Sequence, residues 1–185
     1  MESGTICVPH VIESKRTNKS RAEYTFPKGT MIRAFDGNTG WVINPGEQKA
    51  EQMPEAERET LDRFIFDTSL LDYEKRGNKV SLAGFVELPS GPAYKLLDIS
   101  IHGETNYQYI DADSFLAVQC DTLNADGSIS EDIYRHYKSV DGIMKPTEYE
   151  MRTQGEPDYR AIAKIEKIEL NVEIPDERFQ MPSNP

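Results

Sequence analysis

Turn-forming residues divide this chain into short segments, and their spacing constrains the fold more than any other feature of the sequence. Asp-Gly pairs stand at residues 36–37, 126–127 and 141–142. Each pair lies between runs rich in β-branched and aromatic residues, where Asp and Gly tolerate the positive φ that a tight hairpin turn needs. Many short strands joined by such turns predict an antiparallel meander, with strands over most of 1–45 and 78–175.

The stretch MIRAFDGNTGWVINP, residues 31–45, predicts a hairpin that carries the single tryptophan of the chain. Because side chains alternate along a strand, Trp41 and Ile43 are expected on one face and Val42 on the other. We expect the tryptophan face to be concave and to line a hydrophobic cavity. The residues expected there are Tyr24, Phe26, Trp41, Ile43, Phe64, Tyr107 and Tyr109. The alternative is that Trp41 is core, buried under a helix.

One segment has a helical rather than a strand-like period. Pro54 suits a first helical turn, and Leu61, Phe64 and Ile65 recur at helical spacing, which predicts a short amphipathic helix over about 54–66. Strands return after it without repeats, low-complexity tracts or a linker. The predicted fold is mainly β, a strongly curved antiparallel sheet or open barrel with one helical insertion, in a single domain over 1–185.

Composition removes several classes of function. The chain has 21 Lys and Arg against 32 Asp and Glu, a formal charge of −11, and this balance argues against binding nucleic acid or an anionic membrane surface. No apolar run approaches the ~20 residues of a membrane span, and the first residues lack the pattern of a secretory signal. Cys7 and Cys120 are expected to be free thiols that behave as small buried hydrophobes.

No constellation of residues predicts catalysis, a metal site or a cofactor. The three histidines lie far apart in the sequence and have no ligand spacing. Asp111 and Asp113 stand where a turn favours aspartate, and Tyr134 is expected in a cross-strand packing ladder. Gly37 precedes no helix, so it forms no phosphate loop. The sequence therefore predicts a protein that is not an enzyme.

Four phrases of the sequence occur together in one known family. They are FDGNTGWVINP, YIDADSFLAVQ, YKSVDGIMKPTEYE and IEKIELNVEIPDERFQMP. In order and spacing they resemble the LolA-like outer-membrane lipoprotein-sorting proteins, and within these an uncharacterised bacterial branch. The matching residues are Asp36, Gly37, Trp41, Tyr109, Asp111, Phe115, Leu116, Val140, Asp141, Gly142, Pro146, Asn171, Phe179 and Pro182. The resemblance spans most of the chain.

This resemblance implies an incomplete β-barrel around a hydrophobic cavity, lidded by helices, with no catalytic residues. It implies a periplasmic carrier that holds a lipid acyl chain or a lipoprotein anchor. Whether the carrier is itself tethered to a membrane, through a lipid upstream of Met1, is left open. Members of the family usually have a helix before the first strand, and we expect this chain to lack it, because it opens on SGTICVP. The alternative function is a cell-envelope sensor or protein-interaction domain that recruits a protein partner through an exposed edge strand.

Overall fold

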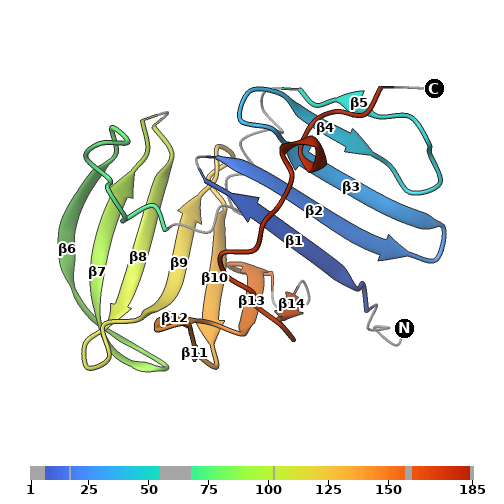
Figure 1. The fold of residues 1–185 in the computed structure, drawn as a ribbon. Coiled ribbons are helices and arrows are strands. Elements are labelled where there is room, and N and C mark those ends of the chain that lie inside the picture. The colour runs from blue at the N-terminus through green and yellow to red at the C-terminus, as the bar shows by residue number, and fades with distance from the viewer. Residues whose placement is uncertain (1–6, 17, 55–67, 102, 157–159, 184–185) are drawn as a thin grey trace. The chain divides into compact units, whose positions relative to one another are not determined.

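A computed structural model describes residues 7–16, 18–54, 68–101, 103–156 and 160–183. The chain forms two compact units, of which unit 1 comprises residues 1–68 and 173–185 and unit 2 comprises residues 69–172 (Figure 1). Among the described residues, the strands of both units pair in antiparallel fashion and the one regular helix is a short 3₁₀ turn. The predicted mainly β, antiparallel class is therefore confirmed.

Unit 1 contains a five-stranded sheet in which neighbours along the chain are neighbours in space, β1-β2-β3-β4-β5. Its strands are β1 (His10–Lys15), β2 (Lys19–Phe26), β3 (Gly29–Phe35), β4 (Gly40–Ile43) and β5 (Glu51–Gln52). Alternating apolar and polar residues in β2 and β3 favour strands that are covered unequally on their two faces.

The predicted hairpin at residues 31–45 is present as β3 and β4. Gly37 takes a φ of 99°, and the Asp36 carboxylate accepts hydrogen bonds from the backbone N–H groups of Asn38 and Thr39 at 2.8 and 2.7 Å. This local bonding holds the turn and fixes the pairing of Ala34 with Trp41. The turn chemistry therefore sets which side chains share a face with the tryptophan.

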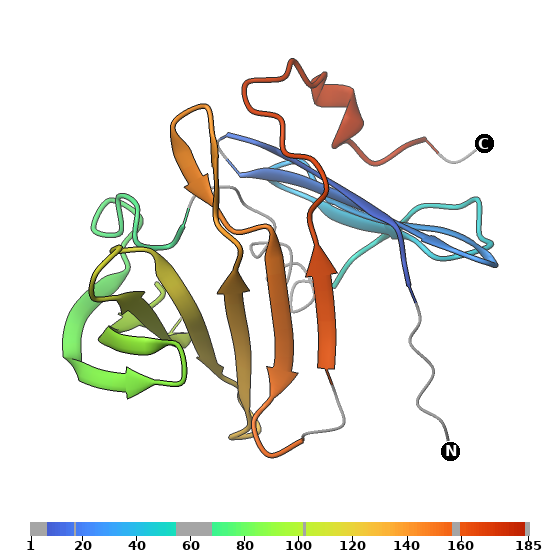
Figure 2. The same cartoon turned by 90° about the horizontal axis from the view of Figure 1, so that it is seen from below.

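Unit 2 contains a seven-stranded sheet in the order β14-β13-β10-β9-β8-β7-β6 and a separate hairpin of β11 and β12. Its strands are β6 (Lys79–Leu88), β7 (Gly91–Ile99), β8 (Thr105–Asp111), β9 (Ala117–Leu123), β10 (Ile129–Arg135), β11 (Lys138–Val140), β12 (Ile143–Lys145), β13 (Glu148–Thr153) and β14 (Arg160–Lys164). Figure 2 shows the strong curvature of this sheet. Since β14 and β6 are separate edges, the sheet does not close into a barrel.

Two predicted boundaries are wrong. Strands are expected through most of 78–175, but the last one ends at Lys164, because Lys164 pairs with Glu148, the first residue of β13. The following KIEKIELNVEI run alternates like a strand but has no neighbouring strand to pair with among the described residues. The first strand begins at His10, later than expected.

The helix predicted over 54–66 falls almost entirely outside the described residues, and no described helix is long and apolar enough to span a membrane.

The cysteines differ in their surroundings. Both are free thiols, as predicted; Cys120 is buried on β9, whereas Cys7 is exposed, so the expectation that both are buried is wrong for Cys7. Burial, and then the nearby carboxylates of Asp132, Asp121 and Asp98, raise the pKa of the Cys120 thiol to about 12.

We therefore expect a thiol reagent at neutral pH to label the native protein once, at Cys7, because a buried thiol with a high pKa supplies almost no thiolate. Denaturation without reductant should release the second equivalent. The check is the mass of the labelled protein before and after denaturation. Two fast labels on the native protein would contradict the burial of Cys120.

Candidate functional site

The C-terminal segment crosses one face of the sheet of unit 1. We call residues 173–183 the strap; it contains the 3₁₀ turn η2 (Asp176–Arg178) and is drawn in red in Figures 1 and 2. Phe179 of the strap is fully buried, and its carbonyl accepts a 2.7 Å hydrogen bond from the indole Nε1–H of Trp41. Met181 packs against the cluster of Ala34, Trp41 and Ala50. Trp41 is therefore only 3% exposed.

Ion pairs hold the other end of the strap. Asp176 lies 2.6 Å from Lys15 Nζ and 2.8 Å from Lys19 Nζ, and the Lys15 ammonium also donates to the Ile174 carbonyl at 2.8 Å. Lys15 and Lys19 are paired directly across β1 and β2, so they form one basic seat for the Asp176 carboxylate. These contacts place the start of η2 on the sheet.

A second charge cluster lies beside the first. Arg178 Nη2 of the strap lies 2.6 Å from Glu13 and 3.4 Å from Glu23, and Arg21 pairs with the same two glutamates. Arg21 is nearly buried, so the glutamates also neutralise a desolvated guanidinium. The cluster balances two positive and two negative charges and joins the strap to β1 and β2.

The Asp176 contacts predict a pH dependence. Hydrogen bonds from Lys15 and then Lys19 lower the pKa of Asp176 to about 2 from an ordinary value of 3.8. A depressed carboxylate pKa contributes stability above the unfolded value, and this stability is lost as the pH falls through the folded value. We expect acrylamide to quench Trp41 fluorescence more strongly between pH 4 and 2, with a smaller change in Asp176→Asn. An identical pH profile in that variant would contradict the assignment.

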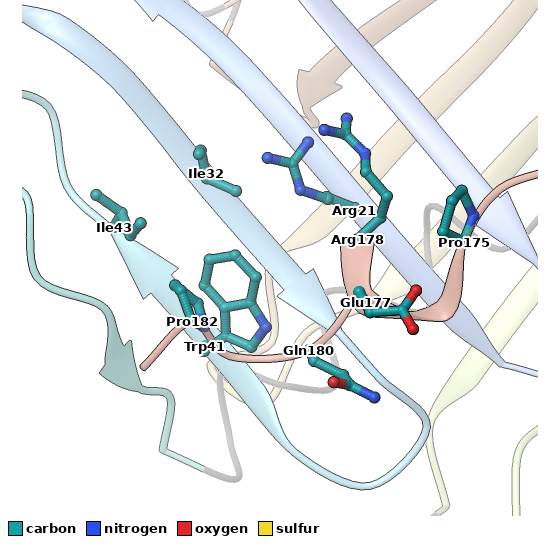
Figure 3. A pocket seen from close by; sticks show the side chains of 9 residues that line it. All are labelled: Arg21, Ile32, Trp41, Ile43, Pro175, Glu177, Arg178, Gln180 and Pro182. Atoms are coloured by element: carbon teal, nitrogen blue, oxygen red, sulfur yellow. The ribbon is translucent and has the colours of Figure 1, made fainter. Parts of the chain in front are cut away.

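A pocket of about 390 Å³ lies between the strap and the sheet (Figure 3). Ile32, Trp41 and Ile43 form the apolar part of its wall on the sheet, and Figure 3 shows the indole ring standing between the isoleucines and the strap. The remaining lining residues are Arg21, Pro175, Glu177, Arg178, Gln180 and Pro182. The volume is within the range of small-molecule sites, and the apolar wall suits an aliphatic group.

The pocket contains part of the predicted site. Trp41 and Ile43 share one apolar cluster, and Val42 belongs to another with Phe35 and Met53, as alternation predicted. The expectation that Tyr24 lies beside Trp41 is wrong. Tyr24 pairs with Met31, whereas Arg21 pairs with Ala34 and hence shares the face of Trp41.

Phe26 lies two residues after Tyr24 on β2 and therefore on the same face, so it too points away from the pocket. Tyr24 instead stacks on His10, with ring centroids 5.9 Å apart. Phe64 lies outside the described residues. Whether any of these residues binds a ligand stays a prediction.

Tyr107 and Tyr109 belong to unit 2 and lie in a polar network. The Lys95 ammonium lies 3.9 Å from the Tyr107 ring centre and 5.4 Å from that of Tyr109. The Tyr109 hydroxyl donates to Asp121 at 2.7 Å, and burial followed by this hydrogen bond raises the pKa of Tyr109. On the same face of the sheet, Glu131 pairs with Arg152. This face has the character of a salt-bridged surface rather than of a lipid cavity.

The opposite face of unit 2 carries an exposed row of aromatic rings that the sequence analysis did not select. Phe85 and Tyr94 meet edge to face at 5.3 Å, and Tyr94 and Phe115 are nearly parallel at 6.4 Å. Phe85 is 60% and Phe115 69% exposed. Phe115 also takes a φ of 58°, which is unusual for a bulky residue and is held by the Asp111 turn. The only sequence signal for this row is Phe115, which was matched to the family phrase.

The described residues contain no group of three or more His, Cys, Asp and Glu side chains arranged to hold a metal ion. Asp111 accepts hydrogen bonds from the Ser114 hydroxyl at 2.6 Å and from the Ser114 backbone N–H at 2.8 Å. The bond from the hydroxyl and then that from the backbone lower the pKa of the Asp111 carboxyl. This bonding is typical of an aspartate that stabilises a turn.

No protein-family model and no curated protein sequence matches this chain. Several solved structures do match this chain. The LolA superfamily protein of Nitrosomonas europaea aligns with 94% of this chain and 81% of its own, at a TM-score of 0.72 and 15% identity. A DUF1329 family protein from Desulfovibrio piger aligns over the same shares, at a TM-score of 0.65 and 12% identity.

A third structure is a domain from Vibrio parahaemolyticus assigned as an outer membrane lipoprotein-sorting protein. It aligns with 89% of this chain and 79% of its own, at a TM-score of 0.55 and 9% identity. At these identities the likeness concerns the fold. The chain has a LolA-like fold, as its sequence phrases predicted.

Proposed function

We propose that this chain is a non-enzymatic periplasmic protein that binds the apolar part of a lipid, either an acyl chain or a lipoprotein anchor. The observation that carries the proposal is the pocket at Trp41. Its wall on the sheet is apolar apart from Arg21, which is paired with glutamates, and the indole N–H of Trp41 is already bonded to Phe179. The ligand then needs no hydrogen bond from this wall. The likeness to lipoprotein-sorting structures supports the same class of ligand and a single LolA-like domain over 1–185.

The driving force in this proposal is burial of methylene groups. Each buried CH₂ contributes about 0.8 kcal/mol, so a chain of about 14–16 carbons supplies roughly 11–13 kcal/mol before ordering costs. Only part of a chain fits in the pocket as it stands. Micromolar binding corresponds to about 8 kcal/mol, so the ligand has to bury most of its chain once ordering costs are subtracted.

The test uses the tryptophan itself as the probe. Titrating the protein with palmitate below its micellar concentration should give a saturable change in Trp41 fluorescence, and Trp41→Phe serves as the optical blank. Calorimetry on Ile43→Asn should show weakened binding, because the substitution places an amide in the apolar wall. Ile162→Asn, on β14 of unit 2 and 45% exposed, is the matched control. Absence of both signals would contradict the proposal.

A second candidate function is recruitment of a protein partner by strand addition. Strand β6 is an edge of the seven-stranded sheet, and its Val80–Val86 stretch contains no charged residue. Leu82 and Phe85 in this stretch are 67% and 60% exposed. Edge strands usually carry charges that prevent pairing, so an uncharged edge favours a partner strand. Leu82→Lys should abolish capture of such a partner and leave palmitate binding unchanged.

A further inference from the structure

The strap is held to its own sheet in a manner that permits release. The contacts that join it to β1, β2 and β4 are made through side chains: Lys15, Lys19 and Trp41 on the sheet, and Asp176 and Arg178 on the strap. The backbone hydrogen bonds of η2, from Arg178 to Pro175 and from Phe179 to Asp176, close within the strap itself. Moving the strap away therefore leaves the hydrogen bonds of the sheet intact.

The strap also covers the surface that an apolar ligand needs. Met181 packs against the Trp41 cluster, and Pro175, Gln180 and Pro182 form the outer wall of the pocket. The pocket of about 390 Å³ is the space left between this wall and the sheet. A long chain that enters along Trp41 must push the strap outward or wait for it to open.

The ion pairs set how readily the strap opens. Asp176 and Arg178 each contact two charged residues of the sheet, and both side chains are more than 40% exposed. Exposed pairs are individually weak and are screened by salt. Together they latch the strap between Asp176 and Arg178, and the buried Phe179 anchors it at the next residue.

We propose that residues 173–183 act as a gate, latched by Asp176 and Arg178, that controls the entry of a lipid chain to the Trp41 pocket. This inference rests on the proposed function. Opening of the latch precedes entry, so the association rate is proportional to the fraction of molecules with the latch open. The gate is a property of this chain's own C-terminal segment and needs no other partner.

The test is the double variant Asp176→Asn/Arg178→Gln, which removes the latch and leaves the net charge unchanged. Its matched control is Asp72→Asn/Lys75→Gln, which removes an exposed 2.9 Å ion pair of unit 2 and is also charge-neutral. Without ligand, the latch variant should show stronger acrylamide quenching of Trp41. In stopped flow with the uncharged 1-monopalmitoylglycerol below its micellar concentration, its association should be about threefold to tenfold faster.

The control variant should match the wild type in both measurements. Raising KCl from about 20 to 500 mM should speed association to the wild type and leave the latch variant nearly unchanged, because salt screens only pairs that are present. Equal association rates for wild type and latch variant, with normal saturation, would overturn the gate alone. Absence of saturable binding in every variant would instead contradict the proposed function, and the gate with it.

Discussion

Replacing Phe179 with alanine is expected to lower the free energy of unfolding by about 3–5 kcal/mol, the usual range for truncating a buried phenylalanine. The Phe179 side chain has a relative exposure of 0%. It belongs to a strap that is also held by exposed ion pairs, by the packing of Met181 and by the Trp41 hydrogen bond. The loss includes both the transfer of the ring and the cavity left under the strap. Urea unfolding followed by far-UV circular dichroism measures it.

The matched control is Phe85→Ala. The Phe85 ring is 60% exposed on an edge strand, so its removal should cost less than about 1 kcal/mol. If both variants lose the same small amount, Phe179 does not anchor the strap. A loss for Phe179→Ala alone supports the packing of the strap as a part of unit 1.

Replacing Trp41 with alanine should also cost about 3–5 kcal/mol, because the side chain is 3% exposed and forms the centre of the Ala34 and Ala50 cluster. The substitution also removes the donor to the Phe179 carbonyl. We expect the double variant with Phe179→Ala to lose less than the sum of the single losses, by about 0.5–3 kcal/mol, because contacting residues are coupled.

The same denaturation measurement, repeated on the single and double variants, gives the coupling energy. Phe85→Ala combined with Trp41→Ala should be additive, since Phe85 belongs to unit 2. Strict additivity between Trp41→Ala and Phe179→Ala would show that the strap and the hairpin are energetically independent. That result would contradict the contact on which the candidate site depends.

Local rules predicted much of this fold from the sequence. The Asp36-Gly37 turn is present, with the positive φ at Gly37 that such a turn requires, and β6 and β8 lie within the stretch where strands were predicted. Tyr134 pairs across the sheet with Tyr149, with ring centroids 5.6 Å apart, as the packing-ladder interpretation expected. These features depend on residues that are close in sequence or on simple alternation, which a single sequence contains.

The site was predicted less well, because it depends on which faces are shared across several strands. Alternation within β2 correctly separates Tyr24 from Arg21, but only the pairing of Arg21 with Ala34, and of Ala34 with Trp41, shows which of them meets the tryptophan. That register follows from counting outward from the tight turns on either side of β3. Of these two turns, only the one at Asp36-Gly37 was predicted, so the face of β2 that meets Trp41 was not determined.

The strap could not be predicted by such rules. Phe179 contacts a residue 138 positions earlier in the chain, and no local pattern encodes a pairing of that range. Pro175 and Pro182 do signal that the segment is not a strand, and the isolated Phe179 between them is the one apolar aromatic of the chain end. The family phrase that ends in MP includes this residue, yet the phrase carries no information on where the segment packs.

Photo-crosslinking with a diazirine-labelled palmitate tests the central claim most directly, because it reports both binding and its place. The probe is added to the full chain below its micellar concentration, and the labelled peptides are identified by mass spectrometry, with unlabelled palmitate as competitor. We predict competable labels within residues 32–43 and 174–182, on the two walls of the Trp41 pocket. Labels confined to the aromatic row of Phe85, Tyr94 and Phe115, or none that palmitate competes away, would contradict a lipid site at Trp41.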